Sequence, residues 1–286
     1  MQIVPVHRHG TPGWADAVAA DLQRNNVATA SGVLDPDRVE ELRGALDAAI
    51  EQDARWIPED RLAAELGRVL FLPVYGEPFL RLLDDGPIYE PAEPLLGRDS
   101  HLYTMTSALT GPGEQGRPLH RDSALAIDGF LAALGLMILL DDFDEASGGT
   151  RFHPEVTAAP PTPEDFEHRA LRLVAPAGSV CWFHGAAWHD STRNTTDHPR
   201  RCIIAAVSRP WIRQRFDMPT ILEHLEPGAL STSAGRRLGF DQLAPGSYEE
   251  YYATPAGRRA AVLARSKPAL RSGPDRSSGP GASLPR

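Results

Sequence analysis

The sequence predicts a mainly β fold with flanking helices, of the barrel or jelly-roll type. Two segments of helical spacing come first, at about 14–25 and 36–52, and beyond residue 68 the chain changes to short apolar runs separated by glycine, proline and aspartate. A helical introduction followed by many short strands is typical of a barrel or jelly roll with helices against one face. At 286 residues, one large domain fits this pattern better than two.

The second helical segment has a clear start. Asp35 provides an N-cap and Pro36 suits the first turn, after which apolar residues recur every three or four positions. The apolar stripe consists of Val39, Leu42, Leu46 and Ile50. An amphipathic helix of this kind ordinarily packs on a sheet as scaffold, so we assign it no chemistry.

Five apolar runs of strand length follow, each bounded by turn residues. They cover residues 69–74, 101–109, 134–140, 179–184 and 202–208. We expect all five to be strands of the barrel. The proline-rich stretch 155–170 is expected to cross the surface instead of joining a sheet.

These segments divide the chain into regions. We predict a single domain over residues 1–264, with a helical N-terminal part at about 12–60, a β core at about 68–210 and a lid or helices at about 211–264. Residues 265–286 are rich in Gly, Pro, Ser and Arg, and we expect a disordered tail there.

Composition argues against several classes of function. The net charge of -9 disfavours broad nucleic-acid binding, which needs a basic surface. The first twenty residues contain no apolar core of signal-peptide length, and no later segment is long and apolar enough to span a membrane, so we expect a cytoplasmic protein. Cys181 and Cys202 are too few for a disulfide framework, and we expect two buried thiols.

The strongest functional signal is the triplet His120-Arg121-Asp122, with His189 and Arg200 farther along. Alternate side chains of a strand point the same way, so His120 and Asp122 would face one site. One carboxylate and two imidazoles can hold a redox-active iron and leave positions open for substrate and oxygen. A strand, a turn and a returning strand would bring Arg200 back beside this pocket, where its fork can clamp a carboxylate.

Three stretches of the sequence carry a family resemblance. They read LHRD, LLDDFDEASGGTRFHP and AGSVCWFHGAAWHDSTRNTTDHPRR, and the similarity extends from the helix at Asp35 to about residue 210. In these stretches the chain resembles the phytanoyl-CoA dioxygenase family of iron(II)- and 2-oxoglutarate-dependent oxygenases, and it looks like the branch that tailors natural products. The resemblance implies a double-stranded β-helix core, which is the cupin-like form of the jelly roll.

The resemblance assigns roles by position. It makes His120, Asp122 and His189 the catalytic metal ligands. It makes Arg200 the partner of the distal carboxylate of 2-oxoglutarate, with Arg201 as the alternative if the register slips by one. Further candidates for contacts with the cosubstrate are Thr106, Thr150 and Ser191.

Two other histidines compete for roles. His184 lies five residues before His189, and the spacing from His189 to Arg200 in the family motif favours His189 as the ligand. His184 is then a packing residue or a hydrogen-bond donor near the site. His153 follows the GGTRF stretch and either lines the pocket or is a structural histidine with satisfied hydrogen bonds.

The activity that the resemblance implies is oxidation of an unactivated C–H bond. Iron(II), 2-oxoglutarate and O2 would be consumed with release of succinate and carbon dioxide, and ascorbate would serve as reductant. Because Asp122 keeps the carboxylate that related halogenases lack, hydroxylation is the default outcome, with desaturation, epoxidation and ring formation also open. We expect a small, mostly apolar secondary metabolite as substrate, and a monomer or homodimer.

Alternatives remain at this stage. An acyl-CoA or an amino acid could be the substrate of the same oxygenase. From other classes, the same fold could serve as a non-catalytic barrel that only binds a small molecule, or the same three ligands could hold zinc for hydrolysis. Retention of the three metal ligands together with Arg200 argues against the non-catalytic barrel.

Overall fold

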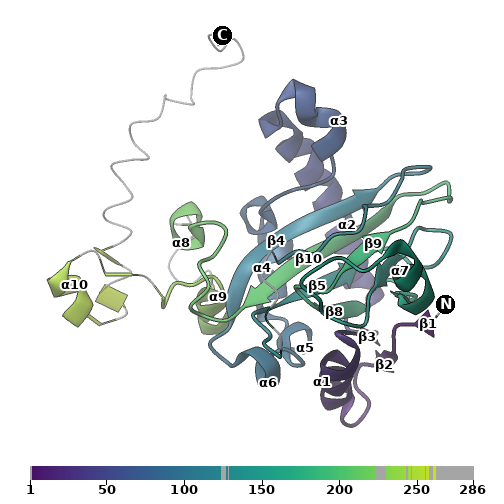
Figure 1. Ribbon diagram of the computed structural model, residues 1–286. Coiled ribbons are helices and arrows are strands. Elements are labelled where there is room, and N and C mark those ends of the chain that lie inside the picture. Colours follow the sequence, from purple (N-terminus) through teal and green to yellow (C-terminus); the bar gives the residue numbers. More distant parts are fainter. Residues whose placement is uncertain are drawn as a thin grey trace.

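The computed structural model describes residues 2–123, 127, 129–222, 230–242, 244–245, 247–254, 256–257 and 260–261. Within these residues two β-sheets pack face to face, and helices cover the outer side of the larger sheet (Figure 1). This arrangement confirms the predicted fold class, a jelly-roll core with flanking helices.

The strands form one sheet of six and one of four. The six-stranded sheet has the order β2 (Val6–Arg8), β3 (Val27–Ser31), β8 (Val180–His184), β5 (Ala133–Leu139), β10 (Arg200–Ser208) and β4 (His101–Thr110). The four-stranded sheet has the order β1 (Gln2–Ile3), β7 (Leu171–Arg172), β6 (Thr150–Phe152) and β9 (His189–Ser191). The first two strands were not predicted, and they add one parallel strand to an edge of each sheet.

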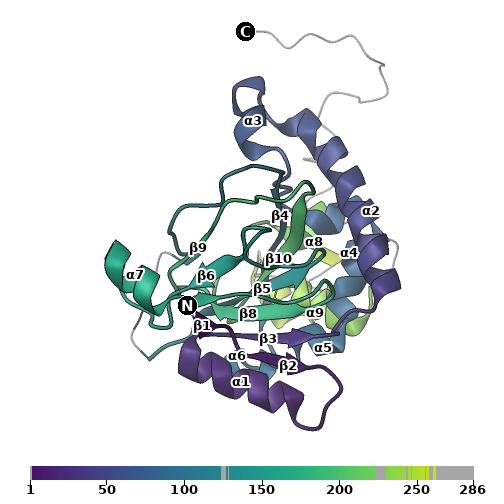
Figure 2. The ribbon, with the colours of Figure 1, turned by 90° about the vertical axis from the view of Figure 1, so that its right-hand side faces the viewer.

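Helices surround the sheets (Figure 2). The α-helices are α1 (Trp14–Asn25), α2 (Pro36–Asp53), α3 (Leu62–Glu65), α4 (Glu77–Arg81), α5 (Gly86–Tyr89), α6 (Glu93–Leu96), α7 (Pro163–Arg169), α8 (Met218–Ile221), α9 (Thr232–Arg237) and α10 (Tyr248–Tyr252). Short 3-10 turns lie at η1 (Ala54–Trp56), η2 (Glu59–Arg61), η3 (Leu72–Tyr75) and η4 (Leu82–Asp84). No helix in the described part of the chain is long and apolar enough to cross a membrane.

Both predicted N-terminal helices are confirmed. The segment at 14–25 is α1, and the segment at 36–52 is α2, which ends one residue later at Asp53. The Asp35 side chain accepts a hydrogen bond of 2.8 Å from the Arg38 backbone N–H, as expected of an N-cap. The apolar stripe of α2 packs in the same core as the outer face of the large sheet.

Side-chain alternation along the large sheet separates two cores. Cys202 pairs with Leu139, and both lie in the inner core between the two sheets. The next residue, Ile203, pairs with Ile138, and both lie in the outer core beneath the helices. Every second residue of β10 therefore faces the interior of the barrel, starting with Arg200.

One end of the barrel gathers the ends of β5, β8, β6 and β9. Leu134 near the start of β5 pairs with His184 at the end of β8, and in the small sheet Phe152 at the end of β6 pairs with His189 at the start of β9. The rings of Phe152 and Phe183 lie 5.1 Å apart and connect the two sheets at this end. We call it the His189 end of the barrel.

The predicted strand at 69–74 is wrong. Only Val69 forms a backbone–backbone hydrogen bond with β4, where its carbonyl accepts from the Ser107 N–H at 3.0 Å; the other bonds to β4 use the hydroxyls of Ser107 and Thr104. Pro73 has no N–H with which to continue a ladder, and the chain turns into η3 instead. The other four predicted strands are present as β4, β5, β8 and β10.

The stretch 155–170 joins no sheet, as predicted, and it contains α7. One further expectation is wrong. His120 and Asp122 do not lie in a continuous strand, since only His120 makes an isolated bridge. Helices occur within 211–264 as predicted, and the predicted tail at 265–286 lies outside the described residues.

Candidate metal and cosubstrate site

The two histidines of the predicted triad face each other across a backbone bridge. The His120 N–H donates to the His189 carbonyl at 2.9 Å, and the His189 N–H donates to the His120 carbonyl at 2.8 Å. The two ring centroids lie 4.2 Å apart. This bridge takes the place of the strand that the sequence predicted, and its two backbone hydrogen bonds hold His120 and His189 side by side.

Asp122 completes the cluster. Each of His120, Asp122 and His189 offers one ligand atom, and these three atoms all lie within 4.8 Å of one another. His189 is buried, whereas Asp122 is exposed and His120 is half-buried, so the cluster is reachable from one side. Arg121 points elsewhere and donates to the Ala158 carbonyl at 3.2 Å.

Hydrogen bonds fix which nitrogen each imidazole presents. His120 Nδ1 lies 2.8 Å from the Pro118 carbonyl oxygen, and His189 Nδ1 lies 3.0 Å from the Ala187 carbonyl oxygen. A carbonyl oxygen can only accept, so Nδ1 is the protonated nitrogen in both rings, and Nε2 has the free lone pair whenever the ring is neutral. Metal-bound histidines ordinarily have this arrangement, in which the second nitrogen donates to a neighbouring acceptor.

Aromatic rings hold the His189 imidazole. Phe152 stacks on it with ring centroids 5.5 Å apart, and Phe183 approaches at 5.2 Å. Burial lowers the pKa of His189, which favours the neutral form that a metal requires. The Phe183 ring fits only because Gly135 faces it, since a Cβ at Gly135 would lie 2.1 Å from the ring.

Arg200 is a buried cation without an anion. Its side chain donates to the Gly148 carbonyl and, at 2.9 Å, to the Thr110 hydroxyl, and its guanidinium lies 4.6 Å from the Phe143 ring centroid. Its Nε has no hydrogen-bond partner, and no carboxylate in the described residues pairs with it. Burial lowers its pKa. A buried charge of this kind is costly unless an anion neutralises it, which fits a carboxylate ligand.

Arg201 does not fit the same role. Its N–H and guanidinium bond to Asp141, and its guanidinium also donates to Asp47 on α2 at 2.9 Å. The side chain thus points to the outer face, as alternation along β10 requires. Arg200, and not Arg201, therefore faces the barrel interior.

The three further candidates for cosubstrate contacts all have hydroxyl side chains, and the surroundings of these side chains differ. Thr106 pairs with Ile204 on the inner face and is half-buried, so its side chain lies toward the interior. Thr150 pairs with Ser191 and is buried. The Ser191 hydroxyl already accepts a hydrogen bond of 2.8 Å from the Arg117 N–H, which ties β9 to the segment before His120.

Sequence reasoning missed Thr110 and Gly135. Thr110 pairs directly with Arg200 across β4 and β10 and supports its guanidinium. Gly135 pairs with Phe183 across β5 and β8 and makes room for the ring against His189. Both roles depend on strand register, and the only signal in the sequence was that each lies in or beside a predicted strand.

His184 and His153 lie outside the cluster. His184 alternates with Phe183 and faces away from His189, and its Nδ1 accepts from the Ala186 N–H at 3.0 Å. His153 is buried, and its Nε2 lies 2.9 Å from Asp165 Oδ2. The geometry therefore groups His189, and not His184, with His120 and Asp122.

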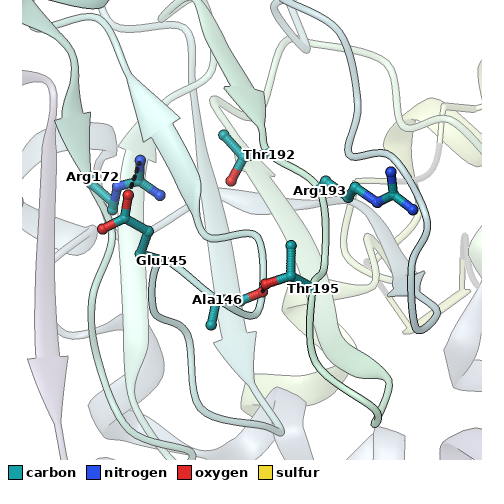
Figure 3. Close-up of a pocket in the computed structure, with 6 residues that line it drawn as sticks. All are labelled: Glu145, Ala146, Arg172, Thr192, Arg193 and Thr195. Atoms are coloured by element: carbon teal, nitrogen blue, oxygen red, sulfur yellow. Dashed lines mark hydrogen bonds and ion pairs between the residues drawn. The ribbon is translucent and has the colours of Figure 1, made fainter.

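The structure contains two cavities of interest. One of about 730 Å³ lies at the His189 end of the barrel and includes His184, Leu134 and Arg209 in its wall. The other, of about 630 Å³, is shown in Figure 3, where Arg172 and Glu145 point toward one another beside Thr192. None of the three clustered residues lines either cavity, so we assign the chemistry to neither of them.

Two relatives are similar in sequence to more than half of the chain. It is 22% identical over 254 residues to the uncharacterised protein Rv1501 of Mycobacterium tuberculosis, a match that covers 85% of this chain and 93% of that protein. It is also 29% identical over 172 residues to the dioxygenase ALT11 of Alternaria alternata, which covers 55% of this chain and 57% of ALT11.

Solved structures share the fold. The non-heme alpha-ketoglutarate-dependent epimerase SnoN from nogalamycin biosynthesis matches with a TM-score of 0.53 and 21% identity, over 70% of this chain and 84% of SnoN. The non-heme monooxygenase ThoJ, solved as a nickel complex, matches with a TM-score of 0.57 and 17% identity, over 70% of this chain and 80% of ThoJ.

The family assignment rests on a match over most of the barrel. The model of the phytanoyl-CoA dioxygenase (PhyH) family matches residues 22–202, which is more than half of the chain and includes His120, Asp122, His189 and Arg200. The chain belongs to the phytanoyl-CoA dioxygenase family.

Proposed function

We propose that the protein is an iron(II)- and 2-oxoglutarate-dependent dioxygenase that hydroxylates, or otherwise oxidises, an unactivated C–H bond of a small, mostly apolar molecule. The observation that carries this proposal is the pairing of two features inside one barrel. Three metal-ligand atoms lie within 4.8 Å of one another, and a buried arginine without an anion faces the same interior.

The residues present fit iron(II). His120 and His189 would bind through Nε2, the nitrogen that their Nδ1 hydrogen bonds leave available, and Asp122 would supply a carboxylate oxygen. Two histidines and one carboxylate are the facial set typical of non-heme iron oxygenases, and they leave coordination positions open. When bound, iron with 2-oxoglutarate and oxygen supplies the oxidising chemistry.

Other side chains of the site would bind 2-oxoglutarate and keep water from His189. Arg200 would neutralise the distal carboxylate of 2-oxoglutarate, since its guanidinium is buried and its Nε is not hydrogen-bonded. Thr110 holds that guanidinium in place. Phe152 and Phe183 exclude water from the buried side of His189. Thr106 and Thr150, on interior-facing positions, are candidates for further cosubstrate contacts.

We extend the proposal to a role in secondary-metabolite biosynthesis. The fold likeness to SnoN, which comes from nogalamycin biosynthesis, supports this assignment. We propose that residues 1–264 form the one catalytic domain, that about 211–264 cover the barrel as a lid or helices, and that the protein acts as a monomer or homodimer without nucleic acid. An acyl-CoA or amino acid substrate is the alternative within the same chemistry.

Succinate release tests the function. Protein purified without oxygen is given iron(II), ascorbate and 2-oxoglutarate, then oxygen, with and without a panel of apolar metabolites. We expect metal-dependent succinate that rises with the true substrate and is lost in His189→Ala. Absence of succinate from the wild type with every panel member, together with failure to bind 2-oxoglutarate, would favour a non-catalytic binding barrel.

Metal preference separates the oxygenase from a zinc hydrolase. The apoprotein is reconstituted anaerobically with iron(II) or zinc, and 2-oxoglutarate turnover and hydrolysis of ester substrates are measured in parallel. The proposal expects turnover with iron only. Hydrolysis supported by zinc, with no turnover of 2-oxoglutarate, would replace the oxygenase proposal.

A further inference from the structure

Asn194 lies in the turn between β9 and β10, which covers residues 192–199, and its side chain is 0% exposed. Its Nδ2 donates to the His198 carbonyl at 2.9 Å, and its Oδ1 accepts from the Thr196 N–H at 3.0 Å and from the Thr196 hydroxyl at 2.6 Å. A second bond from Nδ2 leaves the turn and reaches the Thr110 carbonyl on β4 at 3.0 Å. The amide therefore uses both of its donors, closes the turn and joins it to β4.

The residue that Asn194 reaches on β4 also supports Arg200. Thr110 is the last residue of β4, and it pairs in register with Arg200 at the start of β10. Its hydroxyl accepts from the Arg200 guanidinium at 2.9 Å. Because the carbonyl and the hydroxyl belong to one residue, the bond from Asn194 holds the end of β4 at the point where it supports the buried cation.

The same turn contacts the segment that provides the second acceptor of Arg200, the Gly148 carbonyl. The N–H and the hydroxyl of Thr195 both donate to the Ala146 carbonyl, at 2.7 and 2.9 Å. The Gly148 backbone lies against Thr192, where a Cβ would clash with the Thr192 carbonyl oxygen. The turn thus contacts the segments on both sides of the guanidinium.

Backbone bonds fix Asn194 itself. The Gly113 N–H donates to the Asn194 carbonyl at 2.9 Å, and the Asn194 N–H donates to the Glu114 carbonyl at 3.0 Å. All polar groups of this buried residue are therefore hydrogen-bonded. A buried polar network that is fully satisfied favours one well-defined geometry.

We propose that Asn194 is a positioning residue for cosubstrate binding, which orients the Arg200 guanidinium toward the distal carboxylate of 2-oxoglutarate. A bidentate pair between guanidinium and carboxylate depends on orientation as well as charge. Without the Asn194 bond to Thr110, the guanidinium keeps its charge but loses part of that orientation. Affinity should then fall only for ligands that have the distal carboxylate. This inference rests on the proposed function, since it concerns the 2-oxoglutarate anchor.

A matched pair of 2-oxo acids tests this proposal. 2-Oxoglutarate and 2-oxopentanoate share one carbon chain and the 2-oxo acid group, and only the first has a distal carboxylate. Both are titrated by calorimetry into the full-length, iron(II)-loaded protein without oxygen. We expect the wild type to bind 2-oxoglutarate about tenfold to a hundredfold more tightly than 2-oxopentanoate. Asn194→Ala should weaken 2-oxoglutarate binding about threefold to tenfold and leave the affinity for 2-oxopentanoate unchanged.

A second variant in the same turn is the control. Thr196→Val removes the hydroxyl that donates to Asn194 Oδ1 and leaves both Nδ2 bonds in place. It should leave the affinities for both 2-oxo acids nearly unchanged. Circular dichroism and the melting temperature show whether each variant is folded.

Hydrogen exchange of the wild type tests the same coupling without a substitution. The Thr196 N–H, which donates to Asn194 Oδ1, reports on the closed turn. Because coupling between two sites is reciprocal, a ligand that uses the oriented guanidinium should stabilise the turn. We expect this N–H to exchange several-fold more slowly with saturating 2-oxoglutarate than with saturating 2-oxopentanoate.

The outcomes separate this inference from the proposed function. A folded Asn194→Ala variant that weakens both acids equally, or neither of them, would overturn the role of Asn194, and so would equal exchange of the Thr196 N–H in the two complexes. In those cases the wild-type preference for 2-oxoglutarate would still support the anchor at Arg200. A wild type that binds the two acids equally would contradict that anchor, and the proposed function would fail together with the inference.

Discussion

Gly135 and Phe183 face each other in register on β5 and β8, and the Phe183 ring fills the space that a Cβ at Gly135 would occupy, 2.1 Å from its nearest atom. The same ring lies 5.2 Å from the His189 imidazole. A residue with no side chain on one strand therefore determines how an aromatic ring on the next packs against the His189 imidazole.

Gly135→Ala should displace Phe183 and destabilise the protein. Overpacking of a core costs about 1–3 kcal/mol, and we expect a loss of that order in urea unfolding together with weaker iron(II) binding. Gly135→Ala/Phe183→Leu should recover part of both losses, because the smaller side chain relieves the clash. A double variant no better than Gly135→Ala would contradict this reading of the pair.

Arg200 and its neighbour Arg201 provide a matched test of cosubstrate binding. Arg200→Gln should raise the Kd for 2-oxoglutarate about tenfold to a hundredfold, since a hydrogen bond to a charged group contributes about 1.5–3 kcal/mol. Arg201→Gln should leave that Kd nearly unchanged, because Arg201 pairs with Asp47 and Asp141 on the outer face. Calorimetry on the metal-loaded protein measures both. The reverse order of effects would mean that Arg201 is the anchor.

Thr110 should act on 2-oxoglutarate through Arg200. Thr110→Val removes the acceptor that lies 2.9 Å from the guanidinium, and we expect the Kd for 2-oxoglutarate to rise by about threefold to tenfold. Thr110→Ser keeps the hydroxyl and should behave almost like the wild type. The same calorimetric titration decides, and equal effects of serine and valine would point to packing as the role of Thr110.

These predictions depend on pairings between strands that the sequence alone does not show. The helix after Asp35 and the strands β5, β8 and β10 follow from local periodicity and capping, which a single sequence displays. The grouping of His120, Asp122 and His189 was implied by the family resemblance of the motifs that contain them. The pairing of Thr110 with Arg200 joins residues 90 positions apart, and register of that kind is set by tertiary packing.

The error at residues 69–74 has a similar physical origin. The run is apolar and of strand length, but its only ladder contact is made at Val69, and Pro73 cannot donate the bond that another strand residue would. Val69, Phe71 and Leu72 are core residues, whereas Leu70 and Val74 are exposed, so the apolar run is buried only in part and does not form a strand.

Arg151 should stabilise the strand that carries His189. Its guanidinium binds Asp190 at 2.9 and 2.5 Å and Glu167 on α7 at 2.8 Å, and these carboxylates raise its pKa. Arg151→Met leaves the largely buried Asp190 without its partner and should cost about 3 kcal/mol in urea unfolding. Glu167→Gln should lower the free energy of unfolding by about 1 kcal/mol or less, since Glu167 is exposed. Equal costs would show that Asp190 does not depend on the pair.

The two cysteine thiols should be inert in the folded protein. Burial raises the pKa of Cys181 to about 12 and that of Cys202 to about 11, from an ordinary 9.0. Because the folded pKa values are raised, the thiols favour the folded state below pH 9, and this contribution falls as pH rises from 9 toward 12. A thiol reagent at pH 8 should label neither residue before unfolding and both afterwards. Fast labelling of the native protein would contradict their burial.

Anaerobic binding of iron(II) and 2-oxoglutarate tests the central assignment most directly. The visible absorption band that forms when 2-oxoglutarate chelates a bound iron(II) is recorded for the wild type, His189→Ala, His184→Ala and Arg200→Gln. The account predicts the band in the wild type and in His184→Ala, its loss in His189→Ala, and its appearance only at higher 2-oxoglutarate concentration in Arg200→Gln. A band that survives in His189→Ala and disappears in His184→Ala would contradict the site described above.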